Sequence, residues 1–295
     1  MRGPTRAIKR AGLASLALTF IGFLNLYVFA DRTADFAPWT INPPLTAAFL
    51  GAGFGAGFIL FLLVIRERAW ARIRIVMLTV WEFTVFMLIA TLLHRDKFHL
   101  DAGTGAGRVA AWLWLIVYIA FPLVVGVLLV VQARAPGADP RLTRPLPRLL
   151  TAALVAQGTV MLATGLALFF EPTRVARSWP WSLTPLTARA IAAWFLALGI
   201  AAFHAILERD LPRLRPAAIT YLAFAILQLG AVLRFPDDMR WDSGWSWVYL
   251  AWLASIAVVG AYGVMTARRG WVIAERCINT WSKAKLAKWL KAKRT

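Results

Sequence analysis

Long apolar stretches separated by short polar segments are the dominant pattern of this chain. A membrane core about 30 Å thick needs roughly 20 apolar residues in a helix. Eight stretches meet that requirement, at approximately 11–30, 45–65, 75–94, 109–133, 149–170, 187–207, 216–234 and 246–267. The pattern predicts an all-α, polytopic membrane bundle of about eight transmembrane helices. The connecting loops are too short for a separate soluble domain.

Composition supports a lipid environment. The chain is 60% hydrophobic, with a mean hydropathy of +0.65, and a water-soluble surface cannot hide that much apolar side chain. The net charge of +19 lies between the apolar runs. That placement suits anionic lipid headgroups and gives no reason to expect a nucleic-acid partner. A single cysteine, Cys277, rules out an intrachain disulfide and a metal site built on several thiolates.

The loops predict the orientation, because Lys and Arg are enriched on the cytoplasmic side of membranes. One side carries 24 of the basic residues and the other side 9, which together make the 33 in the chain. We therefore expect both termini in the cytoplasm of a bacterial plasma membrane. The first span resembles a signal peptide in its basic start. However, its apolar run of about 20 residues exceeds the usual 7–15, so it is expected to be retained.

The chain also contains an internal duplication. Pro38-Trp39 to Arg74 aligns with Pro180-Trp181 to Arg215 once Pro44 is skipped, and 15 of 36 aligned pairs are identical. The matches include Glu67-Arg68 against Glu208-Arg209. Each unit has an even number of spans, so the predicted repeats run in parallel about an axis normal to the membrane.

This duplication divides the chain into five segments. They are a basic cytoplasmic N-terminus (1–10), a first four-helix repeat (11–133), a cytoplasmic linker (134–148), a second repeat (149–267) and a basic amphipathic tail (268–295). The tail is expected to bind anionic lipid headgroups through Lys283, Lys285, Lys288, Lys291 and Lys293.

Glu82 is the one acidic residue deep inside a predicted span, and Gln157 lies at similar depth. A carboxylate in lipid is costly unless it is paired, hydrated or protonated. Glu82 is therefore either a neutral, hydrogen-bonded structural group or a proton or cation site. Its aligned counterpart is Ala223, so the duplication does not require it.

Polar and aromatic residues gather on the predicted outer side. Two Pro-Trp-(Thr/Ser)-x-(Asn/Thr)-Pro segments form either turns within an aromatic belt or the rim of an outer vestibule. The candidate vestibule residues are Trp39, Asn42, Trp181, Thr184, Arg189, Arg234 and Asp237. Thr46 and Thr187 lie near helix starts and are expected to cap them.

His94, Asp96 and His99 follow the third span. No cofactor is predicted, but a loop conformation would let His94 and His99 bind a metal or haem. His204 lies most of a bilayer away, near the cytoplasmic end of the sixth span.

Glycines mark the second span. Gly51/Gly55 and Gly53/Gly57 are G-x-x-x-G pairs, which predict a close helix contact. The aligned positions of the second repeat hold larger residues, so we expect that contact in the first repeat only.

The Pro-Trp-x-Leu-Thr-Pro-Leu-Thr-Ala-Arg stretch at 180–189 and Leu93-His94-x-Asp96-x-Phe98-His99 resemble multi-pass membrane proteins of GC-rich bacteria whose motifs have no assigned chemistry. The resemblance implies a membrane location and no mechanism.

Three functions stay open from the sequence. The first is transport of a small solute or ion along a path between the repeats, with Glu82 as the coupling carboxylate. The second is a membrane-embedded enzyme or redox subunit that uses His94, Asp96 and His99, although the chain has no nucleophile–base pair. The third is a scaffold or accessory subunit without a site. A homo-oligomer or a larger membrane complex is compatible with each.

Overall fold

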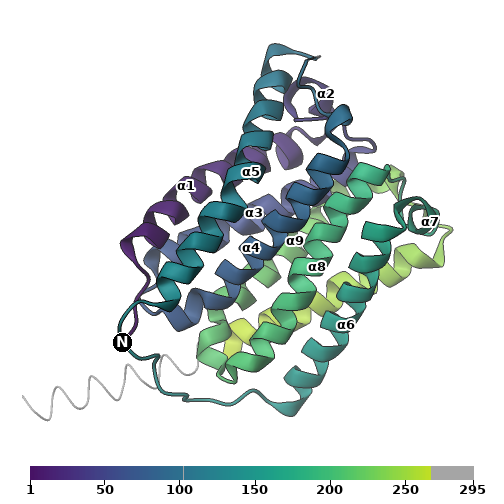
Figure 1. Ribbon diagram of the computed structural model, residues 1–295. Helices are drawn as coiled ribbons and strands as arrows, with labels where there is room; N and C mark the ends of the chain where they lie inside the picture. Colours follow the sequence, from purple (N-terminus) through teal and green to yellow (C-terminus); the bar gives the residue numbers. More distant parts are fainter. Residues whose placement is uncertain (102, 267–295) are drawn as a thin grey trace, which may run out of the picture.

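The computed structural model describes residues 1–101 and 103–266, which form a bundle of long helices (Figure 1). The labelled long helices are α1 (Arg6–Phe23), α3 (Pro44–Arg66), α4 (Trp70–Leu93), α5 (Gly105–Ala133), α6 (Arg148–Phe170), α8 (Pro185–Glu208) and α9 (Arg215–Arg234). The last span, Gly244–Thr266, completes eight helices that are long and apolar enough to cross a membrane. The prediction of an eight-span all-α membrane bundle is confirmed.

Short helical turns connect the long helices. The π-helical turn η1 (Leu24–Val28) continues α1. The remaining turns are η2 (Ala30–Arg32), α2 (Thr33–Phe36), η3 (Arg95–Lys97), α7 (Pro172–Ala176), η4 (Leu211–Leu214) and η5 (Pro236–Asp238). They give the connections that contain them a defined shape without adding a further domain.

Two helices, α1 and α4, begin five residues earlier than the apolar pattern predicts, because their first turns carry partnered basic side chains. The first span, expected from residue 11, starts at Arg6, and the Lys9 ammonium donates to the Val64 and Ile65 carbonyls at the end of α3. The third span, expected from residue 75, starts at Trp70 and includes Arg74, which pairs with carboxylates. Hydropathy alone misses such turns.

The long helices form two groups that lie side by side (Figure 1). The first half contains α1, α3, α4 and α5, and the second half contains α6, α8, α9 and the last span. Between them, α3 packs against α9 and α4 packs against α8. Within the halves, α1 packs on α3 as α6 packs on α8. Helices at equivalent places in the two halves therefore have equivalent neighbours.

The loops divide between two ends of the bundle. The basic end holds the N-terminus, residues 67–69, the linker 134–147 and residues 209–214 (Figure 1). There the Arg2 amide donates to the Ala138 carbonyl over 2.8 Å, and the Arg144 side chain donates to the Thr266 carbonyl over 2.8 Å. The opposite end, here the Pro-Trp end, holds the segments 38–43 and 180–185. Both ends of the described chain thus lie on the same side of the bundle.

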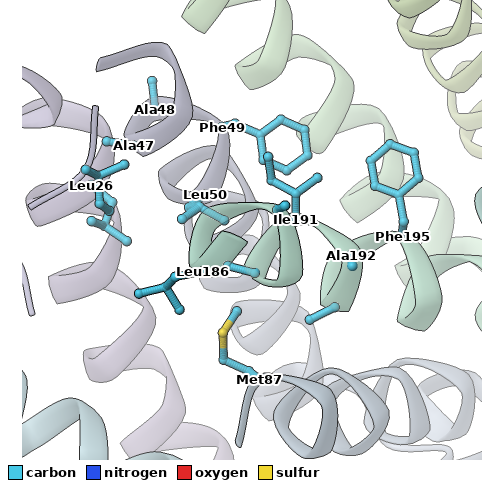
Figure 2. Packing of buried hydrophobic residues seen from close by; sticks show 14 of the residues in the cluster. Leu26, Ala47, Ala48, Phe49, Leu50, Met87, Leu186, Ile191, Ala192 and Phe195 are labelled. Atoms are coloured by element: carbon cyan, nitrogen blue, oxygen red, sulfur yellow. The ribbon is translucent and has the colours of Figure 1, made fainter. Parts of the chain in front are cut away.

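The core between the halves is built from tightly fitted apolar side chains. Figure 2 shows Phe49 and Leu50 of α3 beside Ile191 of α8. Phe49 and Ile191 are fully buried, and the Phe49 and Phe195 rings stack with their centroids 6.5 Å apart. Interdigitation of this kind fixes how the halves meet.

Glycines bring helices close together in both halves. A Cβ on Gly51 would lie 2.4 Å from the Tyr27 amide nitrogen, so only glycine allows η1 to approach α3 this closely. In the second half, Gly158 of α6 and Gly199 of α8 meet, and a Cβ on Gly199 would lie 3.1 Å from the Gly158 carbonyl oxygen. The expectation of a close contact in the first repeat only is therefore wrong, because the second half makes one with other glycines.

Candidate functional site

Glu82 on α4 has a partner that the sequence did not indicate. The His204 Nδ1 on α8 lies 3.7 Å from the Glu82 Oε1, just beyond hydrogen-bond distance. The Glu82 side chain is 11% exposed and that of His204 is 27% exposed. Within the described part of the chain, Glu82 Oε2 and His204 Nδ1 are buried without a hydrogen-bond partner. Each half thus contributes one member of this pair at the α4–α8 interface.

Gln157, the other predicted intramembrane candidate, belongs to a separate polar cluster inside the second half. Its amide nitrogen donates to the Ser255 hydroxyl over 2.9 Å, and the Tyr221 hydroxyl donates to its carbonyl oxygen over 3.1 Å. These bonds join α6, α9 and the last span. The structure does not bring Gln157 to Glu82.

A cavity of about 210 Å³ lies beside the Glu82–His204 pair, and we call it the central cavity. All eight spans contribute to its lining, including Ser15, Gly57, Val117, Leu154, Ala201, Thr220 and Val259. Several lining residues occupy aligned positions of the two halves, among them Thr79 with Thr220 and Phe83 with Phe224. Glu82 and His204 do not line the cavity, but Thr79, Phe83, Ala201 and Ala205 on the same helices do.

The lining of the central cavity is mainly apolar. The hydroxyls of Ser15, Thr79 and Thr220 each donate to a carbonyl four residues earlier in their own helices. A hydroxyl bonded in this way offers little to an ion that has lost its water. The chemistry of the lining therefore suits an apolar molecule better than an ion.

Aromatic rings cluster on the cavity side that faces the Pro-Trp end. The Trp194 ring lies against Phe83, with centroids 4.0 Å apart, and stacks on Phe224 at 6.2 Å. Gly53, the residue aligned with Trp194, leaves space for the indole, since a Cβ there would lie 2.4 Å from a Trp194 ring carbon. The two halves thus close this side with one large residue set against one glycine.

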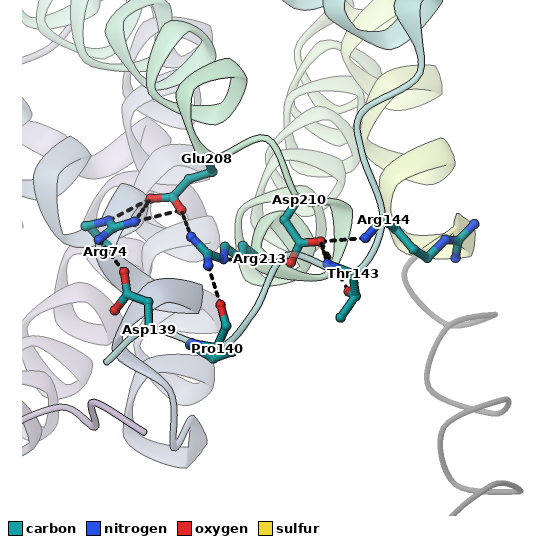
Figure 3. A network of polar contacts seen from close by, with 8 residues as sticks. All are labelled: Arg74, Asp139, Pro140, Thr143, Arg144, Glu208, Asp210 and Arg213. Atoms are coloured by element: carbon teal, nitrogen blue, oxygen red, sulfur yellow. Dashed lines mark hydrogen bonds and ion pairs between the residues drawn. The ribbon is translucent and has the colours of Figure 1, made fainter. Parts of the chain in front are cut away.

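Charged side chains join the halves at the basic end (Figure 3). The Arg74 guanidinium of α4 donates to both oxygens of Glu208 on α8, over 2.6 and 2.8 Å. Arg213 also donates to Glu208, over 3.0 Å. The Glu208 side chain is 6% exposed, so two guanidinium groups compensate a buried carboxylate. We call Arg74, Glu208 and Arg213 the basic-end clamp.

The linker is bound to this clamp. Asp139 accepts from Arg74 over 2.9 Å, and the Pro140 carbonyl accepts from Arg213 (Figure 3). Asp210 accepts from the backbone amides of Thr143 and Arg144, both over 2.8 Å.

The alignment of the halves matches Glu208 with Glu67 and Arg213 with Arg72. Arg72 and Glu67 also form an ion pair, with 3.5 Å between their charged atoms. The equal spacing of these residues in both halves was therefore a usable signal for the Glu208–Arg213 pair, but it did not reveal that Arg74 crosses between the halves.

The predicted vestibule residues at the Pro-Trp end have different surroundings. Trp39 is 2% exposed and Trp181 is fully buried, so the indoles belong to the core and not to an open rim. Asn42, Thr184, Arg234 and Asp237 are exposed, and Arg189 is half-buried.

The helix caps at this end differ from the prediction. Thr184, rather than Thr187, caps α8, and Thr187 completes a capping box with it. Thr46 does not cap α3, because its hydroxyl accepts from the Trp181 indole over 2.9 Å.

Further contacts cross between the halves at this end. Asp238, the neighbour of the predicted vestibule residue Asp237, accepts from the Leu45 amide at the start of α3 over 2.9 Å. A carboxylate at a helix N-terminus is favoured by the exposed amides and the helix dipole. Arg234 donates to the Tyr27 and Val28 carbonyls at the end of η1. Polar contacts therefore close the interface at both of its ends.

The histidines that follow α4 are separately engaged. Arg189 Nη1 lies 2.7 Å from His94 Nε2, and because arginine only donates, this nitrogen accepts and the imidazole is neutral. Burial and the Arg189 charge lower the pKa of His94. His99 bonds to the Ala37 carbonyl and the Thr40 hydroxyl instead. Asp96 is exposed and paired with Lys97, whose hydrogen bond lowers the pKa of that carboxyl.

No group of three or more His, Cys, Asp or Glu side chains with metal-binding geometry occurs in residues 1–101 and 103–266. The five lysines proposed to bind lipid headgroups lie outside the described residues.

No family model, curated protein or solved structure matches this chain. The function must therefore be inferred from the geometry of the bundle itself.

Proposed function

We propose that this membrane protein binds a small, mainly apolar solute in the central cavity and passes it across the bilayer by relative movement of its halves. The observation that carries the proposal is the cavity's position between two four-helix halves, with all eight spans in its wall. Polar contacts close the interface between the halves at both ends. A transporter whose two parallel repeats move relative to each other needs such contacts to close each end of its path. The apolar lining favours the solute alternative over the ion alternative.

The apolar lining of the cavity supports a binding role over a scaffold without a site. Apolar cavities of comparable size bind small aromatic molecules. The enzyme alternative lacks such support, because His94, Asp96 and His99 have separate partners.

We further propose that the halves arose by duplication, with both termini in the cytoplasm of a bacterial plasma membrane. The 15 identical pairs and the equivalent helix neighbours support the duplication. The excess of basic residues on one side supports the orientation. A C-terminal reporter that is active only in the periplasm would contradict this topology.

Photolabelling of the purified full-length protein in lipid nanodiscs tests the binding proposal. A small diazirine-bearing aromatic hydrocarbon should label residues such as Thr79 and Thr220, and an excess of unlabelled hydrocarbon should reduce the labelling. Ala201→Phe fills the cavity and should remove most of it. Ala163→Phe makes the same change at an exposed position of α6 and should leave it intact. Labelling confined to lipid-facing residues, and equal in both variants, would overturn the proposal.

A further inference from the structure

We infer that Glu82 and His204 together form a proton-binding site shared by the two halves, which makes the proposed transport responsive to protons. The inference rests on the proposed function for its physiological role. The site itself rests on geometry: a carboxylate and an imidazole from different halves lie 3.7 Å apart at the α4–α8 interface. Neither Glu82 Oε2 nor His204 Nδ1 has another partner in the described part of the chain.

One shared proton satisfies this pair. With one proton present, the site is either a carboxylic acid beside a neutral imidazole or a carboxylate beside an imidazolium. Both forms have no net charge, and a small rotation would bring Oε1 and Nδ1 to hydrogen-bond distance. Losing the proton leaves a net negative charge in the membrane, and gaining a second leaves a net positive charge. A structural hydrogen bond alone would not need two titratable groups.

Other charges do not replace this partnership. On α4 and α8, the charged groups nearest the pair are Arg74 and Glu208, which bind each other closer to the basic end. The other helices that pack on α4 or α8 are α3, α5, α6 and α9, and they carry charged side chains only in or near their terminal turns. Glu208 lies four residues after His204 on α8, but Arg74 and Arg213 hold its carboxylate. In the described part of the chain, Glu82 is therefore the carboxyl group that lies within 4 Å of His204.

The duplication supplies an internal comparison. The positions aligned with Glu82 and His204 are Ala223 on α9 and Leu63 on α3, at the other interface between the halves. Equivalent helices thus pack there with two apolar residues. Packing does not require an ionisable pair at this place, and its presence at one interface only points to a chemical role.

The pair also lies where movement of the halves would change it. The interface that holds it also walls the central cavity, through Thr79 and Phe83 on α4 and Ala201 and Ala205 on α8. Because α4 and α8 belong to different halves, their separation would part the carboxyl from the imidazole. Proton release or uptake would then accompany opening of the cavity.

Infrared difference spectroscopy across a pH titration tests this site in the full-length protein in nanodiscs, without any solute. The wild type should show the C=O stretch of a protonated carboxylic acid that disappears in Glu82→Gln and persists in the control Glu171→Gln. In His204→Gln, the midpoint pH at which that band titrates should differ from the wild-type midpoint by about one pH unit or more, because coupled groups titrate as a pair. An unchanged midpoint in His204→Gln would show that Glu82 titrates alone and would overturn the shared site.

Two further double variants distinguish loss of the proton-binding site from failure of the protein to fold. Glu82→Ala combined with His204→Leu copies the aligned residues, so it should assemble normally and lose the band. Glu82→His combined with His204→Glu exchanges the groups and should restore a titrating carboxyl. Loss of the band in the exchanged, correctly assembled protein would count against the pair. Hydrocarbon labelling of the cavity is measured separately, so failure of either idea is distinguishable from failure of the other.

Discussion

At the scale of single residues, the structure shows how membrane-edge side chains obtain partners from the other half. Arg189 binds His94, Asp238 binds the start of α3, and Trp181 binds Thr46. Each contact joins groups that the sequence places far apart. The types of residue were visible in the sequence, but their partners depended on how the two halves pack.

His94 should make stability depend on pH. Its pKa is lowered by burial and by Arg189, whereas an unfolded histidine titrates near 6.5. Below that pH the unfolded chain binds a proton that the folded chain resists, so the free energy of unfolding falls as the pH decreases. We expect the Tm of the wild type to fall between about pH 7.5 and 5.

The variant His94→Gln isolates this effect. Glutamine keeps an acceptor for Arg189 and does not titrate in this range. Its Tm should therefore depend less on pH, while His99 and His204 contribute equally to both proteins. Parallel Tm profiles for wild type and variant would contradict the assignment.

At the scale of helices, hydropathy located all eight spans, because a lipid-facing helix must be apolar over most of its length. It located the helix starts less well, since Lys9 and Arg74 are helical and satisfied by partners that only the fold provides. The Glu82–His204 pair was missed for a related reason. Neither residue has an ionisable counterpart in the other repeat, so alignment of the halves gave no hint that α4 and α8 are neighbours.

Gly51 should be essential to the packing of α3 on η1. In Gly51→Ala, the new Cβ would lie 2.4 Å from the Tyr27 amide nitrogen, a backbone atom that cannot rotate away. We expect the free energy of unfolding to fall by about 1–3 kcal/mol. Gly105→Ala is the matched control, because its Cβ position has no described atom within 4 Å apart from its chain neighbours and its own helix backbone. That control should be neutral or gain up to about 1 kcal/mol. Unfolding by denaturant in mixed micelles measures both, and equal effects would contradict the close approach.

At the scale of the whole molecule, the two halves meet through an apolar core that is closed by polar contacts at each end. The central cavity lies between these closures, beside the interface that holds the Glu82–His204 pair. The sequence predicted the two-part organisation and the position of Glu82. It could not predict the cavity, which depends on the sizes of side chains from all eight spans.

The basic-end clamp should contribute strongly to holding the halves together. In Arg74→Met, Glu208 loses its two-bond partner and keeps Arg213. Breaking a fully buried ion pair costs about 3–5 kcal/mol, and the remaining arginine should reduce this loss to about 2 kcal/mol. Arg68→Met, at an exposed position of the same end, should change stability by less than about 0.5 kcal/mol. Equal losses in chemical unfolding would show that the clamp is not specific.

The linker gives the clamp an order of assembly. Proteins are synthesised from the N-terminus, so Arg74 emerges from the ribosome long before Glu208. Asp139 lies in the linker that follows the fourth span and binds the same guanidinium, so the first half carries its own counterion while the second half is still being made. Glu208 then joins a pair that already exists. A nascent chain stalled after the linker should crosslink between positions 74 and 139, and absence of that crosslink would show that the pair forms only in the finished protein.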